Sequence, residues 1–476
     1  MLGVQGSRYT PFVTVPGAAT RTSGRIDAGS AALIVALVLL PLYPKVGLIA
    51  VRGTYVPVRL DDFITLGVIA AWGITLVRAR RLPRVPSIAP FVLAWLAAGL
   101  VALAIGAALL GTVSLDTGFL FWAKPIEYLA LGWAAYDLLD SPERLRLAIL
   151  AIFITAAVVL MYAMLERFHW VPPAPNYATD VTARRGVLGS TMGDQHQMAS
   201  YLGIVTLLGI AMWQRYPGAV RITGILALAV TAYVVLHAGG RSEFFSLAIC
   251  SLLLAAWRPA RAPALAMVGF LAIAFLLPAP VERALDGQLG NRSGSQTVVL
   301  PTPGPSTQPG GGSPEPSSSA PPIDVSDRID DLPDDRSLEI RFRERWPVFI
   351  QTALRNPLLG AGPSAATEAA DGYYIRSFTE IGVIGTLIFG ALILSVVVAL
   401  QRVFRWADGT ARAGAIGLMA GTLFVGLVGV LIDTWVASRV MQLYWPAVGT
   451  ILAAGQLAGV PSGMRSLRPS LDARRT

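Results

Sequence analysis

The chain has 476 residues, of which 54% are hydrophobic and only 14% are charged. A soluble domain carries about 25% charged residues, so this composition excludes a soluble globular protein and indicates that most of the chain lies in lipid. The formal net charge of +9 does not indicate a nucleic-acid partner, because the sequence holds no soluble basic domain. The single cysteine, Cys250, excludes an intramolecular disulfide.

Twelve hydrophobic stretches predict an all-α polytopic membrane protein with about twelve transmembrane helices, because a spanning helix needs about 20 mostly apolar residues. The predicted spans are roughly 30–49, 60–77, 88–110, 118–138, 145–165, 196–213, 220–237, 242–257, 262–280, 373–400, 411–431 and 436–456. We expect residues 1–29 to form a disordered cytoplasmic tail and residues 457–476 a basic cytoplasmic tail.

Arginine residues cluster in every second loop. They follow the second, fourth, sixth, eighth and tenth spans and the last one: Arg78, Arg80, Arg81, Arg84, Arg144, Arg146, Arg215, Arg221, Arg258, Arg261, Arg402, Arg405, Arg412, Arg465, Arg468, Arg474 and Arg475. Because short loops rich in Lys and Arg stay in the cytoplasm, we predict a multi-pass protein of the cytoplasmic (inner) cell membrane with both termini inside. The loop 166–195 and the long loop 281–372 then face outward.

The first candidate site lies in the outward loop 166–195. Arg184 and Arg185 are suited to clamping a diphosphate, since each guanidinium binds two oxygens with one planar fork. Asp194 and His196 are close enough in sequence to share a proton or to orient a hydroxyl group. The alternative is that His196 lies near the start of a helix and has no chemical task.

Two further charged groups lie within or beside predicted spans. Arg241 belongs to a tight outward turn between the seventh and eighth spans, where an ionisable group is expensive and is functional by default. The alternative is a structural pair of Arg241 with Glu243 or with a lipid phosphate. Lys124 and Glu127 form an intramembrane pair next to Pro125, and we interpret that pair as structural.

The long outward loop has two parts of different character. Residues 291–335 are rich in Ser, Pro, Gly and then Asp, and we predict them to be flexible. Residues 337–371 are predicted to be helical and Arg-rich, with Arg341 and Arg345 on one helix face and Arg343 elsewhere. Such a face suits phosphate; the alternative is a solvated helix that rests on lipid head groups. Gly360 and Gly362 then allow a tight turn.

A carboxylate marks the point where the long loop re-enters the membrane. Asp371 lies at this boundary and is a candidate base, with Tyr374 close behind it. Glu380 lies about two helical turns deeper, and its spacing favours an ion pair with Arg376. The sequence contains no P-loop, no HExxH zinc motif and no Rossmann fingerprint, so we expect neither a metal nor another cofactor.

Four stretches resemble the O-antigen ligase and O-antigen polymerase family of bacterial membrane proteins. Arg185 to Leu202 resembles the family's Arg…Gly-Thr-Phe…Asn-Pro-Asn…Ala-Tyr-Leu stretch, and Gly240 to Ser242 stands where the family has a Ser-Arg-Gly turn. Arg345 to Gly362 is similar to its Arg-x-x-x-Trp…Pro-Leu-Leu-Gly-x-Gly stretch. Asp371 to Gly385 is similar to His-Asn-x-Tyr-Leu…Glu-x-Gly-x-x-Gly. The family's twelve spans and late external loop also match the predicted topology.

Two departures from the family pattern bear on the chemistry. Asp371 stands where the ligases have a histidine, which favours the polymerase branch, and Gln195-His196 replaces the usual Pro-Asn. Asp371 and His196 therefore both remain candidates for the general base.

The resemblance implies a GT-C-like fold and glycosyl transfer at the outer face of the membrane. The donor would be a glycan on polyprenyl (undecaprenyl) diphosphate, and a hydroxyl of an acceptor glycan would attack it. Arginines would stabilise the leaving diphosphate. The candidates are Arg185, Arg241 and Arg345, with Arg184 and Arg341 as substitutes. Polymerase-like transfer is favoured over a glycan ligase acting on a lipid or protein acceptor.

Two other classes of protein compete with an enzyme. A transporter or flippase of lipid-linked glycan would be expected to show two halves of similar design and short loops, and this chain shows neither. A scaffold or receptor would use the long loop to bind glycan or protein without chemistry.

Overall fold

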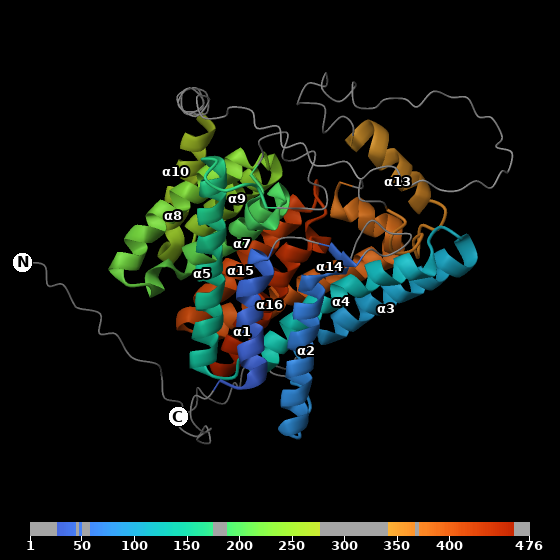
Figure 1. Cartoon of the computed structure of the whole chain (residues 1–476), viewed down its shortest axis with the longest axis horizontal. Helices are drawn as coiled ribbons and strands as arrows, with labels where there is room; N and C mark the ends of the chain where they lie inside the picture. Colours follow the sequence, from blue (N-terminus) through green and yellow to red (C-terminus); the bar gives the residue numbers. More distant parts are fainter. Residues whose placement is uncertain are drawn as a thin grey trace, which may run out of the picture.

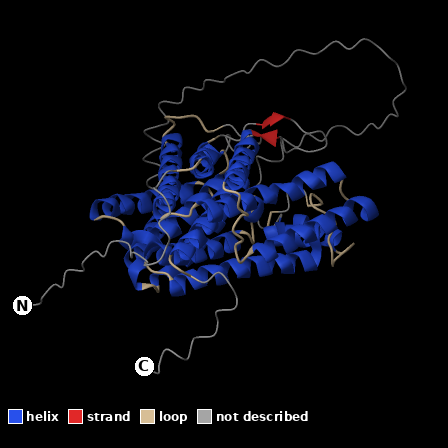
Figure 2. Cartoon of the chain, turned by 90° about the horizontal axis from the view of Figure 1, so that it is seen from below, coloured by secondary structure: helices blue, strands red, loops and turns tan. Residues whose placement is uncertain are grey.

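The computed structural model describes residues 26–43, 47–49, 58–174, 188–276, 341–366 and 371–460. Most of the described chain is helical, and the short β1–β2 pair is its only sheet (Figure 2). Among the described residues, seven helices are long and apolar enough to cross a membrane, judged by length and composition. The prediction of an all-α, multi-pass membrane protein is therefore confirmed at this level.

The elements follow the predicted stretches in chain order. They are α1 (Ala28–Leu42), β1 (Gly47–Ile49), β2 (Val58–Arg59), α2 (Leu60–Arg78), α3 (Ala89–Ile105), η1 (Gly106–Leu110), α4 (Leu115–Leu138), α5 (Pro142–Arg167), η2 (Ser190–Met192), α7 (Gln195–Met212), η3 (Trp213–Arg215), α8 (Gly218–His237), α9 (Arg241–Ala255), η4 (Arg258–Ala260), α10 (Arg261–Leu276), η7 (Arg341–Arg345), α13 (Trp346–Ala353), α14 (Tyr373–Trp406), α15 (Gly409–Val428), η9 (Thr434–Val436) and α16 (Ser438–Leu457).

Each predicted span coincides with one helix, but the count of twelve stays a prediction. The helices that meet the spanning criterion are α2, α3 with η1, α5, α8, α10 with η4, α14 and α15. Of the others, α1 and α9 have only 15 residues each, and α4 carries four Asp, Glu or Lys side chains. Residues 1–25, 291–335 and 461–476, for which tails and a flexible insert are predicted, lie outside the described residues.

Close backbone contacts between helices position the central bundle. α4 packs against α16, and α7 packs against α15. At the first contact Gly132 meets Gly449, where an added Cβ on Gly449 would lie 2.1 Å from the Gly132 carbonyl oxygen. Small residues allow such close approach in membrane bundles. Any larger side chain at Gly449 would therefore push α4 and α16 apart.

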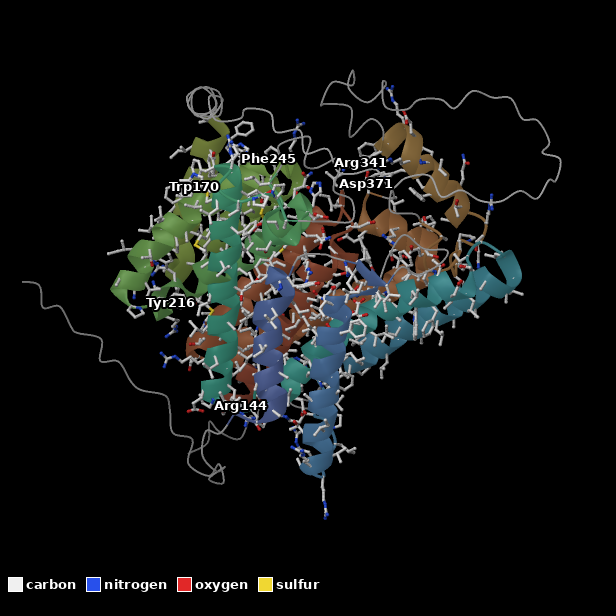
Figure 3. The ribbon with its side chains drawn as sticks, viewed as in Figure 1. Arg144, Trp170, Tyr216, Phe245, Arg341 and Asp371 are labelled. Carbon is white, nitrogen blue, oxygen red and sulfur yellow. The ribbon has the colours of Figure 1, made fainter. Side chains whose placement is uncertain are left out.

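The helices differ in their inclination. α1, α2 and α5 run roughly parallel, while α3 and α4 are strongly inclined to them and extend to one side of the molecule (Figure 1). α13 lies above this side, next to the start of α14. Arg144 lies toward the opposite end of the molecule from Trp170, Arg341 and Asp371 (Figure 3). This placement is the one expected of loops that alternate between two sides of a membrane.

The span predicted over 373–400 lies within α14, but this helix has an internal break. Gly382, with φ 68° and ψ −173°, interrupts α14. The segment 357–362 supplies the missing hydrogen bonds at this break. The N–H groups of Ala361 and Gly362 donate to the carbonyls of Thr379 and Glu380, at 2.8 and 3.0 Å.

The exchange is reciprocal. The N–H groups of Val383 and Ile384 donate to the carbonyls of Pro357 and Leu358, at 2.9 and 3.1 Å. The two backbone segments lie so close that a Cβ on Gly382 would be 2.5 Å from the Leu358 carbonyl oxygen. The turn predicted at Gly360 and Gly362, with φ values of 81° and 100°, thus serves mainly to seat this segment in the helix break.

Candidate functional site

One cavity of about 440 Å³ lies among the start of α2, the middle of α3 and α4, the starts of α7 and α14, and the segment 432–438. Seven of the ionisable residues singled out from the sequence line it: Lys124, Glu127, Asp194, His196, Asp371, Arg376 and Glu380. They come from three separate regions of the sequence. Figure 3 shows Arg341 and Asp371 next to each other at the start of the helical stretch 341–353.

His196 is held by a carboxylate that the sequence reasoning did not choose as a site residue. Its Nδ1 lies 2.9 Å from Glu243 Oε1, and the Glu243 side chain is fully buried whereas that of His196 is 32% exposed. The Ser242 hydroxyl donates to the other oxygen of Glu243 at 2.8 Å. A carboxylate only accepts hydrogen bonds, so Nδ1 carries the proton, and the Nε2 lone pair accepts from the Gln195 side-chain amide.

The local structure explains why the imidazole points into the cavity. Asp194 is the N-cap of α7, and its carboxylate accepts from the Gln197 N–H at 2.9 Å. This cap fixes the first turn of the helix and places His196 at its second residue. Gln195 Nε2 lies 3.2 Å from His196 Nε2. His196 therefore lies near the start of a helix, as the alternative has it, and it has a buried carboxylate partner.

Asp371 joins the late segment to the spans. Arg345 Nη1 lies 2.5 Å from Asp371 Oδ2, and Arg341 Nε lies 3.4 Å from the same oxygen. The expectation that Arg341 and Arg345 share a face is thus confirmed. Trp346 Nε1 donates to the Asp371 carbonyl at 2.9 Å. Asp371 itself has a φ of 38°, a backbone conformation that a non-glycine residue adopts only when its surroundings hold it there.

The pair predicted between Arg376 and Glu380 is present, and Asp433 joins it. Arg376 Nε lies 3.2 Å from Glu380 Oε1, and its Nη1 lies 2.9 Å from Asp433 Oδ2. The Ser364 N–H donates to Glu380 at 3.1 Å. Burial raises the pKa of Asp433 above its usual range, and the Arg376 guanidinium opposes that shift.

A third charged group lines the cavity from α2 and α4. Lys124 Nζ contacts Asp62 and lies 2.8 Å from Glu127 Oε2. The predicted Lys124–Glu127 pair is confirmed, but all three side chains lie at the cavity rather than in a packed helix contact.

The remaining predicted residues do not line the cavity or lie outside the described residues. Arg241 is the first residue of α9, exposed, and two positions before Glu243. Tyr374 points away, since its hydroxyl donates to the Gly426 carbonyl at 2.9 Å; its neighbour Tyr373 lines the cavity instead. Arg184 and Arg185 fall in 175–187, outside the described residues.

Sequence reasoning missed Glu243, Asp433 and Asp62 as members of the site. Asp433 had a usable signal, because it is an ionisable residue between two apolar spans, where such groups mark functional sites by default. Glu243 was considered only as a partner of Arg241.

Within the described part of the chain, no three His, Cys, Asp or Glu side chains lie close enough together to hold a metal ion. No protein-family model matches this chain, and no curated protein matches it either.

Proposed function

We propose that the protein is a membrane glycosyltransferase that transfers or polymerises glycan from a polyprenyl-diphosphate donor onto an acceptor glycan. One observation carries the proposal: a single cavity is lined both by His196, which pairs with Glu243, and by Asp371, which pairs with Arg341 and Arg345. A base and cationic groups beside one hollow are what transfer from a lipid diphosphate requires.

Each of these side chains has a defined role in the proposed reaction. The acceptor hydroxyl oxygen bonds to the anomeric carbon of the donor sugar while the bond from that carbon to the phosphate oxygen breaks. The hydroxyl proton passes to His196 Nε2, and the bonding electron pair leaves with the lipid diphosphate. Arg341 and Arg345 stabilise the negative charge that develops on that diphosphate, and fixed cationic groups are effective there because they need no reorganisation.

His196 is a better general base than Asp371. Behind His196 lies the fully buried carboxylate of Glu243, which stabilises the imidazolium that forms when the proton arrives. Asp371 already accepts from Arg345 and contacts Arg341 through the same oxygen. Its role is to hold the two arginines over the cavity until the donor diphosphate replaces it as their partner.

The other arginines singled out from the sequence keep their proposed role near the diphosphate. Arg241 follows the turn that leads into Glu243, and Arg184 and Arg185 precede the α7 start by about ten residues in sequence. Arg376 is less suited, because two carboxylates already pair with it.

We further propose that the chain has twelve spans in a GT-C-like arrangement, with both termini in the cytoplasm and the cavity toward the outer face of the inner membrane. The opposite placement of Arg144 and Asp371 supports this orientation (Figure 3), since the arginine-rich loops stay inside. Polymerase-like transfer is favoured because Asp371 stands where the similar ligases have histidine. Membrane lipid and the acceptor glycan are the expected partners.

The test replaces Arg345 with alanine. We expect Arg345→Ala to lose polymer and to accumulate lipid-linked repeat units, measured by mass analysis of the lipid-linked glycans in a strain that carries only the variant. Arg355→Ala is the matched control, because Arg355 is exposed just after α13 and, unlike Arg345, forms no ion pair with Asp371 in the described structure. Polymer of normal amount and length in Arg345→Ala, at equal expression, would refute the proposal.

A further inference from the structure

The cavity has a second polar region that the proposed chemistry does not use. We propose that this region binds an uncharged, hydroxyl-rich sugar residue of the substrate. We call it the hydroxyl subsite and define it by Asp62, Lys124, Glu127, Tyr128 and Ser200, all of which line the cavity. The inference rests on the proposed function. Four of the five residues lie outside the stretches that resemble the ligase and polymerase family.

The charge of the subsite selects against phosphate. One cation, Lys124, lies between the carboxylates of Asp62 and Glu127. The exposed fractions of the three side chains are 21%, 21% and 27%, so each reaches the cavity. Two negative charges against one positive charge repel a diphosphate. The same groups offer hydrogen-bond acceptors and a donor, which is what a ring of neutral hydroxyls needs.

Two buried hydroxyls point to a ligand independently of these charges. Tyr128 and Ser200 are each only 1% exposed, and both line the cavity. Neither the Tyr128 hydroxyl nor the Ser200 hydroxyl has a hydrogen-bond partner in the described part of the protein. Buried polar side-chain atoms nearly always have a partner, and a sugar hydroxyl in the cavity would supply one to each.

The walls and size of the cavity fit a sugar ring. Trp95, Phe121 and Trp122 line it beside the subsite, and the apolar C–H face of a sugar packs well on aromatic rings. A volume of about 440 Å³ falls in the range of about 300–1,000 Å³ for small-molecule pockets. The hydroxyl subsite can therefore hold a sugar while the diphosphate lies at the arginines.

The test uses a pair of tyrosines that differ only in position. Tyr128→Phe removes the hydroxyl at the cavity and breaks no hydrogen bond within the described protein. Tyr201→Phe is the matched control, since Tyr201 is 0% exposed, also has an unpartnered hydroxyl, and lies outside the cavity lining. Glu127→Gln is a second variant, which removes a charge whose contact in the described structure is Lys124.

Purified full-length protein in nanodiscs is assayed with lipid-linked repeat units as donor and with the oligosaccharide that mild acid releases from them as acceptor. We expect Tyr128→Phe to raise the KM of either the donor or the acceptor about two- to tenfold, which is the loss expected for one neutral hydrogen bond. Tyr201→Phe should leave both KM values unchanged. Glu127→Gln should raise the same KM about tenfold or more, because hydrogen bonds to charged groups are stronger.

The two KM values identify the source of the sugar. A rise in the KM of the released oligosaccharide assigns the hydroxyl subsite to the acceptor, and a rise in the KM of the lipid-linked unit assigns it to the donor sugar. If both variants match Tyr201→Phe in both values while the unmodified protein makes polymer, the inference is wrong and the proposed function stands. If the unmodified protein makes no polymer from these substrates, the proposed function fails first, and the inference falls with it.

Discussion

Replacing Glu243 with glutamine removes the negative charge behind His196 but keeps a side chain of nearly the same shape. The variant can still accept a hydrogen bond from Nδ1, which lies 2.9 Å from Oε1 in the structure. We expect expression and folding to stay close to normal and the turnover rate to fall, because the charge matters most when His196 holds the acceptor's proton.

The size of the effect follows from the short distance and the burial. Unit charges separated by 2.9 Å interact by about 6 kcal/mol at an effective dielectric constant of about 20. The glutamine keeps a neutral hydrogen bond, so the loss should be smaller than this figure. We expect kcat to fall by about 10²- to 10³-fold, which corresponds to about 3–4 kcal/mol.

The assay compares three variants in nanodiscs by the rate of polymer formation at saturating donor: Glu243→Gln, His196→Ala and the double variant. Since Glu243 acts through His196, the double variant should be no slower than His196→Ala alone, a non-additivity expected of groups that work as a unit. Glu143→Gln, an exposed glutamate in the first turn of α5, is the control. An unchanged rate in Glu243→Gln, or losses that simply multiply in the double variant, would refute the assignment of His196 as the base.

Three further results are expected. Gly382→Ala should destabilise the protein by at least about 2 kcal/mol, seen as a lower melting temperature in detergent, because φ is 68° and Leu358 lies against the new Cβ; an unchanged melting temperature would argue against the helix break. Asp371→Asn should slow turnover less than His196→Ala does, since Asp371 positions arginines; an equal or larger loss in the same rate assay would favour Asp371 as the base. Arg241→Ala should lose polymer at unchanged expression, and a normal polymer ladder would remove Arg241 from the diphosphate site.

Sequence patterns predicted the helices well because their signal is local. A run of about 20 apolar residues has few alternatives to a helix in lipid, so each predicted span has a helix at the same place. Pairs three or four residues apart on one helix were predictable for the same reason, as with Arg376 and Glu380 or Lys124 and Glu127.

The partners across helices could not be predicted in this way. Glu243 meets His196 across 47 residues, and Asp62 meets Lys124 across 62 residues. Each contact depends on how two helices pack, and one sequence alone does not determine which faces meet. The helix break at Gly382 was missed because its apolar pattern continues unchanged through the glycine.

The break in α14 explains how a segment outside the helical bundle can hold arginines accurately over a cavity. In lipid, unpaired N–H and C=O groups are expensive, so a broken helix is tolerated only where other groups pair with it. The segment 357–362 forms four backbone hydrogen bonds with the N–H and C=O groups at the break in α14. This segment begins four residues after the end of α13. Backbone pairing thus fixes the C-terminal end of the segment 341–362, and the contacts of Arg345 and Trp346 with Asp371 fix its N-terminal end. Because both ends of the segment are attached to Asp371 and to the first part of α14, the arginines have little freedom to move. A shift of either anchor should therefore impair catalysis even where every charged side chain is retained.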